Sequence, residues 1–384
     1  MSAARVARPY YSHVEGLRGV AALYVVLYHV WQAAIAHPAT ATLPMLLAAT
    51  PFLQYGHFAV AAFIVISGYC LGLPVAQRAG LPFDAKKFFL RRARRLMPAY
   101  VPVVILSTIP FAAATIITGG HVNVLHLAVA ALMHIALIHN LFYATNEYLN
   151  GPLWSIALEC QIYVVFALLL VPLWRRFGVA AQLALALALG FVPHLLLHRF
   201  DWTVPWLLGL FGMGVFAADV TARNAWPRVP WRWLTVLSAI GTLVLLLQYR
   251  DGGGNDWRTS GPDIALGATL ALFFIASARD ERIPAARFLA LRPIVFLGTF
   301  SYSLYLIHAP LVDLTGDVLV RVHASPLASG VVWCALIVAI VAAAHAFYRV
   351  FERPFLNPAF REAIDADLER TDPHDAPKVL AAAS

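Results

Sequence analysis

Charged residues and cysteines are scarce in this chain of 384 residues. Asp, Glu, Lys and Arg together make up 12% of it and hydrophobic residues 61%, whereas a soluble domain carries about 25% charged residues. This composition excludes an ordinary soluble domain and predicts a polytopic membrane protein. The three cysteines, Cys70, Cys160 and Cys334, lie in apolar runs without the spacing of a metal site. We therefore expect small core residues, no disulfide framework and no metal centre.

Ten apolar segments are long enough to cross a bilayer, which takes about 17–25 helical residues. They lie near residues 14–36, 54–76, 97–118, 152–174, 178–198, 203–220, 231–249, 262–279, 294–315 and 328–350. The first segment contains Arg18 and His29, which a removable signal peptide does not need, so we expect it to be retained. A further apolar run, 124–143, contains three histidines and precedes the polar stretch 143–151. We therefore predict an all-α polytopic membrane helical bundle of about ten transmembrane helices plus one re-entrant or peripheral helix.

The basic residues predict a topology rather than a nucleic-acid partner. The net charge is +8, and seven Lys and Arg lie in the polar stretch Gln77–Arg95, which the positive-inside rule places in the cytoplasm. If the 124–143 run does not cross, all but four of the 28 Lys and Arg lie on the cytoplasmic side. The four exceptions are Arg199, Arg250, Arg258 and Arg321. We expect a protein of the cytoplasmic membrane with both termini in the cytoplasm, comprising one membrane domain (1–355) and a charged, partly disordered tail (356–384).

Arg18 and His29 lie eleven residues apart in the first apolar segment. Eleven helical residues turn through about 1100°, roughly 20° past three full turns, and rise about 16 Å, so both side chains face the same way. Ionisable residues within a bilayer are costly and are functional candidates. The spacing suggests a path for a long anionic substrate from Arg18 toward His29. The structural alternative is an arginine that reaches the interface and a histidine that hydrogen-bonds between helices.

Glu159 and His308 fall at the depth of His29 in the predicted helices. Each lies about seven residues from the outer end of its segment, or ~10 Å. A carboxylate and an imidazole at one depth can form a base and the group that orients it. We therefore predict that Glu159 pairs with a histidine. The alternative is that Glu159 is a structural partner of a histidine or tryptophan.

Six motifs, in this order along the chain, resemble the membrane-bound acyltransferase family 3. They are Glu15–Gly19 followed by His29, Phe63–Gly68, Phe88–Tyr100, Leu153–Glu159 with Gln161 and Tyr163, Gly298–His308 and Phe351–Pro354. The resemblance covers roughly residues 10–355. It implies transfer of an acyl group, usually acetyl, from cytoplasmic acyl-CoA to a hydroxyl of a glycan, a lipid-linked sugar or a natural product. Acyl-CoA is then a co-substrate, membrane lipids surround the protein, and no cofactor is bound permanently.

The resemblance also implies roles for residues of this sequence. It makes Arg18 and His29 the essential arginine and histidine, and Glu159 the motif glutamate; the family often has a second acidic residue next to that glutamate, where this chain has Cys160. We predict that His29 and Glu159 are catalytic. Arginine forks bind phosphate in bidentate geometry, and the predicted donor-binding residues are Arg18, Arg91, Arg92, Arg94 and Arg95. Further candidates for the site are Ser67, Trp154, Ser155, Tyr302, Ser303 and His308. The arginine cluster has an alternative role as an anchor for lipid headgroups.

Two reaction routes remain open at this stage. In the direct route, which we prefer on economy, His29 deprotonates the acceptor hydroxyl as it attacks the thioester. In the covalent route a nucleophile such as Ser67 or Ser303 carries the acyl group. The rival function is a non-catalytic proton-coupled transporter or a lipid or glycan flippase, in which Arg, His and Glu form a proton relay. Some family members carry a fused extracytoplasmic esterase-like domain, and we expect none in this chain.

Overall fold

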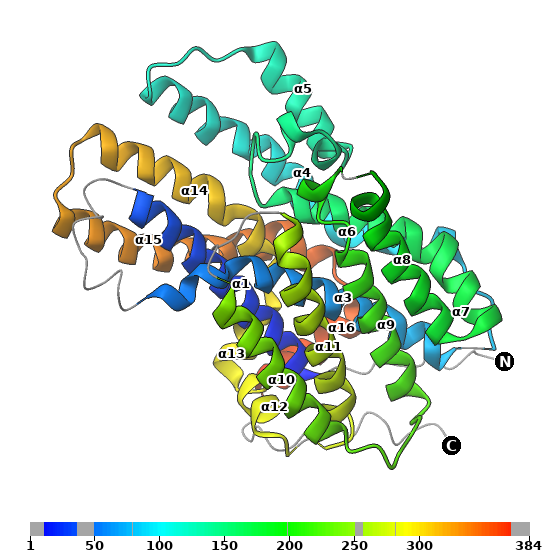
Figure 1. Cartoon of the computed structure of the whole chain (residues 1–384). Coiled ribbons are helices and arrows are strands. Elements are labelled where there is room, and N and C mark those ends of the chain that lie inside the picture. Colours follow the sequence, from blue (N-terminus) through cyan, green and yellow to red (C-terminus); the bar gives the residue numbers. More distant parts are fainter. Residues whose placement is uncertain are drawn as a thin grey trace.

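All regular structure in the described residues is helical (Figure 1). The computed structural model describes residues 11–36, 50–78, 80–197, 199–249, 256–280 and 282–369. The α-helices are α1 (Ser12–Ala36), α3 (Gly56–Gln77), α4 (Ala85–Ile117), α5 (Val124–Ile135), α6 (Leu153–Val165), α7 (Val171–Phe177), α8 (Val179–Leu197), α9 (Leu207–Ala222), α10 (Trp231–Gln248), α11 (Ser260–Ser277), α12 (Pro284–Leu289), α13 (Arg292–Thr299), α14 (Ser301–Arg321), α15 (Pro326–Phe347) and α16 (Pro358–Glu369). Two π-helical turns, Phe166–Leu170 and Tyr348–Glu352, continue α6 into α7 and extend α15.

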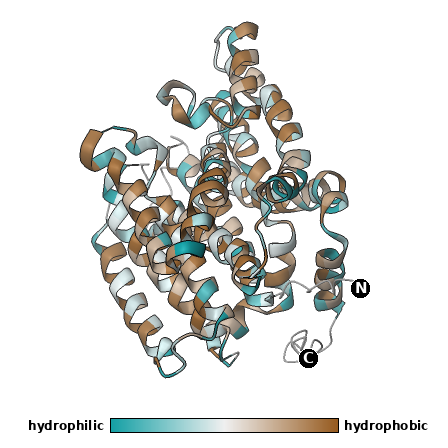
Figure 2. Cartoon of the chain, turned by 90° about the vertical axis from the view of Figure 1, so that its right-hand side faces the viewer, coloured by the Kyte–Doolittle hydropathy of each residue, from teal (hydrophilic) through white to brown (hydrophobic). Residues whose placement is uncertain are grey.

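Within these residues, ten helical segments are long and apolar enough to cross a membrane. They overlap the ten segments expected from hydropathy, and α5, with 12 residues, is too short to be one of them. The prediction of an all-α polytopic bundle with about ten transmembrane helices is confirmed, and the described residues also form the short helices α5, α12, α13 and α16. Hydrophobic residues dominate the long helices in Figure 2, as expected for surfaces that face lipid.

Two helices form the centre of the bundle. In the apolar 18-residue stretch of each span, 83% of the residues are buried in the span that contains α9 and 72% in the span that contains α3, against 6% in α10. α3 packs along α9 and also against α1 and α11, while α1 contacts α13 and α14. Gly68 of α3 and Gly214 of α9 lie where a Cβ atom would meet the backbone of the partner helix. Small residues thus let these two helices approach closely, as is common between membrane helices.

The predicted span 294–315 is wrong in its boundaries. α13 ends at Thr299, Phe300 has φ −120° and ψ 20°, and a new helix begins at Ser301. α14 runs to Arg321, so His308 lies 13 residues from that end rather than seven. At 1.5 Å per residue this is about 20 Å. The expected distance of His308 from the end of its helix, about 10 Å, is therefore too short.

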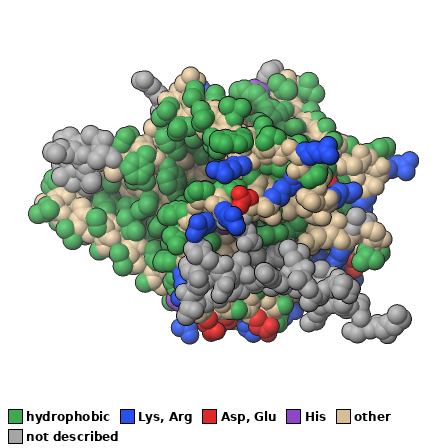
Figure 3. All heavy atoms as spheres, turned by 90° about the horizontal axis from the view of Figure 1, so that it is seen from below, with side chains coloured by type: hydrophobic (Ala, Val, Ile, Leu, Met, Phe, Trp, Pro, Cys, Tyr) green, Lys and Arg blue, Asp and Glu red, His purple; other side chains and the backbone are tan. Residues whose placement is uncertain are grey.

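The second part of the basic stretch Gln77–Arg95 is helical, since α4 begins at Ala85. Asp84 caps α4 by accepting a hydrogen bond from the backbone N–H of Lys87 at 2.9 Å, which is the usual role of Asp at a helix start. α4 therefore carries the arginine cluster on its first turns. Figure 3 shows Lys and Arg side chains near the middle and right of one face of the molecule, next to a largely hydrophobic area.

Two further expectations are modified by the structure. Cys334 is exposed on α15, so its prediction as a core residue is wrong, whereas Cys70 and Cys160 are partly buried; none of the three forms a disulfide. The predicted tail 356–384 includes α16, which packs against α13. Arg353 binds Asp365 of α16 at 3.0 Å. Residues 370–384 lie outside the described residues.

Candidate active site

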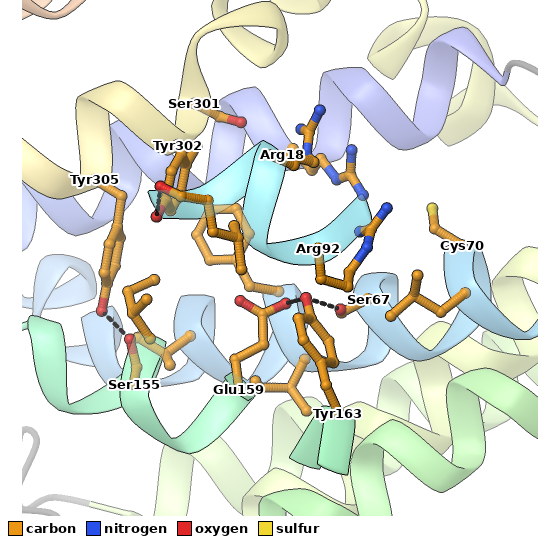
Figure 4. Close-up of a pocket in the computed structure, with 17 residues that line it drawn as sticks. Arg18, Ser67, Cys70, Arg92, Ser155, Glu159, Tyr163, Ser301, Tyr302 and Tyr305 are labelled. Atoms are coloured by element: carbon orange, nitrogen blue, oxygen red, sulfur yellow. Dashed lines mark hydrogen bonds between the residues drawn. The ribbon is translucent and has the colours of Figure 1, made fainter. Parts of the chain in front are cut away.

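A cavity of about 100 Å³ lies where α1, α3, α4, α6 and α14 meet (Figure 4). Its polar lining residues are Arg18, Ser67, Arg92, Arg95, Ser155, Glu159, Tyr163, Ser301, Tyr302 and Tyr305. In Figure 4 the arginines Arg18 and Arg92 lie at one end of the cavity, and the pair of Tyr305 and Ser155 lies at the other. The cavity therefore has a cationic end and a neutral, hydroxyl-rich end.

Arg18 at the cationic end is held by its own helix. Its Nη1 donates to Glu15 Oε1 at 2.8 Å, three residues earlier on α1, and the Arg18 side chain is 18% exposed. The Glu15 side chain is 7% exposed. The ion pair fixes the guanidinium while leaving part of it accessible from the cavity, as binding an anion requires.

The predicted cluster of four arginines divides into two pairs. Arg92 and Arg95 line the cavity, whereas Arg91 and Arg94 are exposed on the surface of α4. The separation follows from helix geometry, since residues three apart face nearly the same way and adjacent residues do not. Of the four predicted donor-binding arginines on α4, the cavity therefore receives two.

A hydrogen-bonded chain of three side chains crosses the cavity wall. The Tyr163 hydroxyl donates to Glu159 Oε1 at 2.5 Å, and Ser67 Oγ lies 3.1 Å from the same hydroxyl oxygen. Because the Tyr163 proton goes to the carboxylate, Ser67 is the donor to Tyr163. Glu159 is thus oriented by a tyrosine four residues later on the same helix. The predicted pairing of Glu159 with a histidine is not what the structure shows.

His29 contacts another histidine instead. His29 Nδ1 lies 3.2 Å from Nε2 of His308, and the ring centroids are 4.9 Å apart. The His308 ring lies 5.6 Å from the ring of Tyr305, which lines the cavity. The Tyr305 hydroxyl is 2.7 Å from Ser155 Oγ. The histidine pair therefore adjoins the hydroxyl-rich end of the cavity, through Tyr305.

The remaining sequence candidates lie in different surroundings. Tyr302 lines the cavity and donates to the Leu96 carbonyl at 3.3 Å. Ser303 is fully buried outside it and donates to Glu352 Oε2 at 2.7 Å. Trp154 is also outside the cavity lining, with its indole stacked at 6.5 Å on the His57 ring. The structure thus brings seven of the predicted residues to one cavity: Arg18, Arg92, Arg95, Glu159, Ser67, Ser155 and Tyr302. It leaves six out of the cavity lining: His29, His308, Arg91, Arg94, Trp154 and Ser303.

The sequence assigned no role in the site to four polar residues of interest. Tyr163 and Tyr305 could have been found, because they lie four residues after Glu159 and three before His308, which are spacings that bring helical side chains together. Glu352 is buried on the π-helical turn, with Oε1 4.0 Å from Arg95 Nη2. The buried Asp263 binds His57 Nε2 at 3.1 Å, from a helix about 200 residues later in the chain, and no local pattern indicates that contact.

A second histidine pair lies away from the cavity, near the short helix α5. His134 and His139 are fully buried and stack with ring centroids 3.7 Å apart at an angle of 9°. Burial lowers the pKa of both rings, that of His139 to about 3, so both are neutral at neutral pH. Across the described ranges, no group of three or more His, Cys, Asp or Glu is placed to hold a metal ion.

The arrangement combines three groups of side chains with different chemistry. Three arginines in the lining, two of them at one end, can bind an anion; a carboxylate and two hydroxyls form a connected chain in the middle, and an imidazole pair adjoins the other end. A group that carries phosphates at one end and a reactive carbonyl at the other could extend between them. The histidine pair would then be near the reacting centre.

Several known proteins are similar to this chain in sequence. A family model described as "Acyltransferase domain" matches residues 11–349. The peptidoglycan O-acetyltransferase OatA of Listeria monocytogenes is 25% identical over 361 residues, covering 82% of this chain and 51% of that protein. The O-acetyltransferase OatA of Staphylococcus aureus is 26% identical over 330 residues, covering 79% of this chain and 51% of its own length. The chain thus spans about half the length of these relatives. No solved structure shows significant similarity to it.

Proposed function

Because this chain belongs to the acyltransferase domain family, we propose that it is an integral membrane O-acyltransferase that moves an acyl group, most simply acetyl, from cytoplasmic acyl-CoA to a hydroxyl of a glycan. A lipid-linked sugar or a natural product is an alternative acceptor of the same chemistry. The observation that carries the proposal is the cavity that joins three arginines to the neighbourhood of His29 and His308.

The cationic end fits a phosphate-bearing donor. CoA carries its phosphates at one end of a flexible arm and the thioester at the other, and Arg18, Arg92 and Arg95 present guanidinium groups to the cavity. Arginine forks bind phosphate oxygens with charge-assisted hydrogen bonds. The cavity of about 100 Å³ is smaller than the roughly 300–1,000 Å³ of pockets that bury drug-sized ligands. We therefore place the acyl thioester inside the cavity and the nucleotide outside it, beyond the arginines.

The histidine end fits proton transfer. In the direct route, His29 takes the proton of the acceptor hydroxyl as the hydroxyl oxygen bonds to the thioester carbonyl carbon. The carbon–sulfur bond then breaks, and the departing thiolate takes the proton from His29. Histidine is the most frequent general base, and such a base contributes typically 10²–10⁴-fold to the rate. Glu159, held by Tyr163, lies in the middle of the cavity, between the arginine end and the hydroxyl-rich end.

The relatives' names motivate the choice of acceptor. One is called a peptidoglycan O-acetyltransferase, and another carries the O-acetyltransferase name alone. A glycan of the cell envelope is therefore the acceptor we favour. The accompanying topology, with both termini and the arginine end of the cavity in the cytoplasm, rests on the distribution of Lys and Arg along the chain. It brings the donor from the cytoplasmic side and the acceptor from the other.

Membrane vesicles with the cytoplasmic face outward test this proposal. Acetyl-CoA labelled in the acetyl group is added to vesicles that contain the protein and to matched vesicles that lack it. We expect label to appear in the glycan fraction, and to depend on the protein. A protein that only transports a proton, lipid or glycan transfers no label, so equal labelling of both preparations would contradict the enzyme assignment. Label entering the protein-containing vesicles as free acetate would do the same.

A further inference from the structure

The two carbonyl contacts of the histidine pair fix which ring nitrogens carry protons. His29 Nδ1 lies 2.9 Å from the Val25 carbonyl oxygen, and His308 Nδ1 lies 2.7 Å from the Tyr305 carbonyl oxygen. A carbonyl oxygen only accepts, so each Nδ1 is the protonated nitrogen of its ring. In a neutral imidazole the other nitrogen then carries the lone pair. His308 Nε2 is therefore an acceptor, and it faces His29 Nδ1 at 3.2 Å.

The same argument leaves the second nitrogen of His29 for chemistry. Both described hydrogen bonds of this ring involve Nδ1, which is shared between the Val25 carbonyl and His308 Nε2. The lone pair of His29 is consequently on Nε2. The ring is also only partly buried, whereas His308 is fully buried. Of the two histidines, His29 is thus the one that can meet a substrate, and His308 is the one that contacts His29 from behind.

We infer that His308 is the positioning residue of His29, holding the ring in the tautomer whose Nε2 can accept the acceptor's hydroxyl proton. This inference rests on the proposed function, in which His29 is the general base. When the hydroxyl proton moves to Nε2, His29 becomes an imidazolium, and its Nδ1–H bond to His308 Nε2 becomes a charge-assisted hydrogen bond. The proton leaves again from Nε2 to the thiolate formed as the carbon–sulfur bond breaks. His308 keeps its own proton on Nδ1 throughout.

This role is usually filled by a carboxylate, which orients the base and stabilises its charged form. Here the carboxylate that lines the cavity, Glu159, is hydrogen-bonded to Tyr163 instead. A second imidazole supplies the orientation without a formal negative charge in the apolar interior, where an uncompensated charge is costly. Tyr305 connects this arrangement to the cavity, because its carbonyl fixes His308 and its hydroxyl side lines the cavity wall.

Two substitutions at one position separate positioning from packing. In His308→Gln, the amide oxygen can reach the place of the imidazole Nε2 and accept from His29 Nδ1, whereas His308→Leu fills similar space without an acceptor. We expect His308→Leu to lower kcat for acetyl transfer about 10- to 100-fold with an unchanged KM for acetyl-CoA, and His308→Gln to stay within about threefold of wild type. His345→Gln on α15, where the ring packs against Phe296 and Phe300, is the matched control and should retain wild-type kcat.

A double substitution makes the test independent of protein stability. If His308 acts through His29, His308→Leu should cause no further loss in a protein that already carries His29→Ala, because groups that act as a unit are not additive. Equal impairment of the Gln and Leu variants, an undiminished His308→Leu enzyme or a full additional loss in the double variant would overturn the inference. Failure of the proposed function itself is a different result, in which His29→Ala transfers acetyl as fast as wild type.

Discussion

Gly19 of α1 faces Gly298 of α13 across a backbone-to-backbone contact. A Cβ atom on Gly19 would lie 2.6 Å from the Gly298 nitrogen and 2.7 Å from the Ile294 carbonyl oxygen. At this contact α13 packs against α1, one residue from Arg18. α14 starts just after the end of α13. Close packing between two helices therefore explains the glycine at position 19 of the first motif, Glu15–Gly19, independently of the chemistry of Arg18.

The first prediction concerns this contact. Gly19→Val should destabilise the protein in detergent by about 1–3 kcal/mol or more, because the added side chain meets backbone that cannot move aside. The measurement is the midpoint of thermal unfolding of the purified variant. Gly241→Ala on α10 is the control, since no atom lies within 4 Å of its Cβ position, and it should unfold at the wild-type temperature or above. A Gly19→Val protein as stable as wild type would contradict the packing account.

The second prediction separates the arginines of α4. Arg92 lines the cavity and Arg91, its neighbour in the chain, is exposed. Loss of a charge-assisted hydrogen bond costs about 1.5–3 kcal/mol, or roughly 10- to 150-fold in affinity. Arg92→Gln should therefore weaken acetyl-CoA binding in nanodiscs by about that factor, while Arg91→Gln binds as wild type. Equal losses for both variants would indicate general attraction to a basic surface instead of a contact within the cavity.

The third prediction distinguishes the reaction routes. Ser67 donates its hydroxyl proton to Tyr163, and in the direct route it carries no acyl group. Ser67→Ala should keep at least about a tenth of wild-type turnover, since a neutral hydrogen bond is worth about 0.5–1.5 kcal/mol. Mass spectrometry of enzyme incubated with acetyl-CoA should find no acetyl ester at Ser67. An acetylated Ser67 together with an inactive Ala variant would replace the direct route by the covalent one.

The fourth prediction concerns topology. Lys86 and Ala144 are both exposed, one on the first turn of α4 and the other within the polar stretch 143–151 that follows α5. Single cysteines at these positions, in a protein lacking the three native ones, should react differently with an impermeant thiol reagent in intact cells. Positive-inside counting predicts reaction at position 144 only. Labelling at position 86 alone would reverse the orientation, with the donor approaching from the outside.

The number and approximate limits of the spans could be predicted because the length and hydropathy of each apolar segment follow directly from its own residues. The break between α13 and α14 could not, because it follows from how α13 packs on α1 through Gly19 and Gly298. That break lengthens the distance from His308 to the end of its helix, but the contact between His308 and His29 keeps the two histidines on one level, as expected from the sequence.

The site was predictable where a single helix carries the pattern. Arg18 and His29 lie on the continuous helix α1, as their spacing indicated. The division of the arginine cluster follows from the same periodicity, and it would have been visible if Asp84 had been recognised as the cap of α4. The contact between His29 and His308 joins residues 279 positions apart, so only the tertiary structure shows it.

The central claim is that His29 performs the proton transfer next to a donor bound by the arginines. Its most direct test is the turnover of purified His29→Ala with labelled acetyl-CoA, measured alongside acetyl-CoA binding and the amount of folded protein. We predict normal folding, binding close to wild type and a loss of acetyl transfer of about 10²–10⁴-fold. Turnover above a tenth of wild type would contradict the claim and remove His29 from the mechanism.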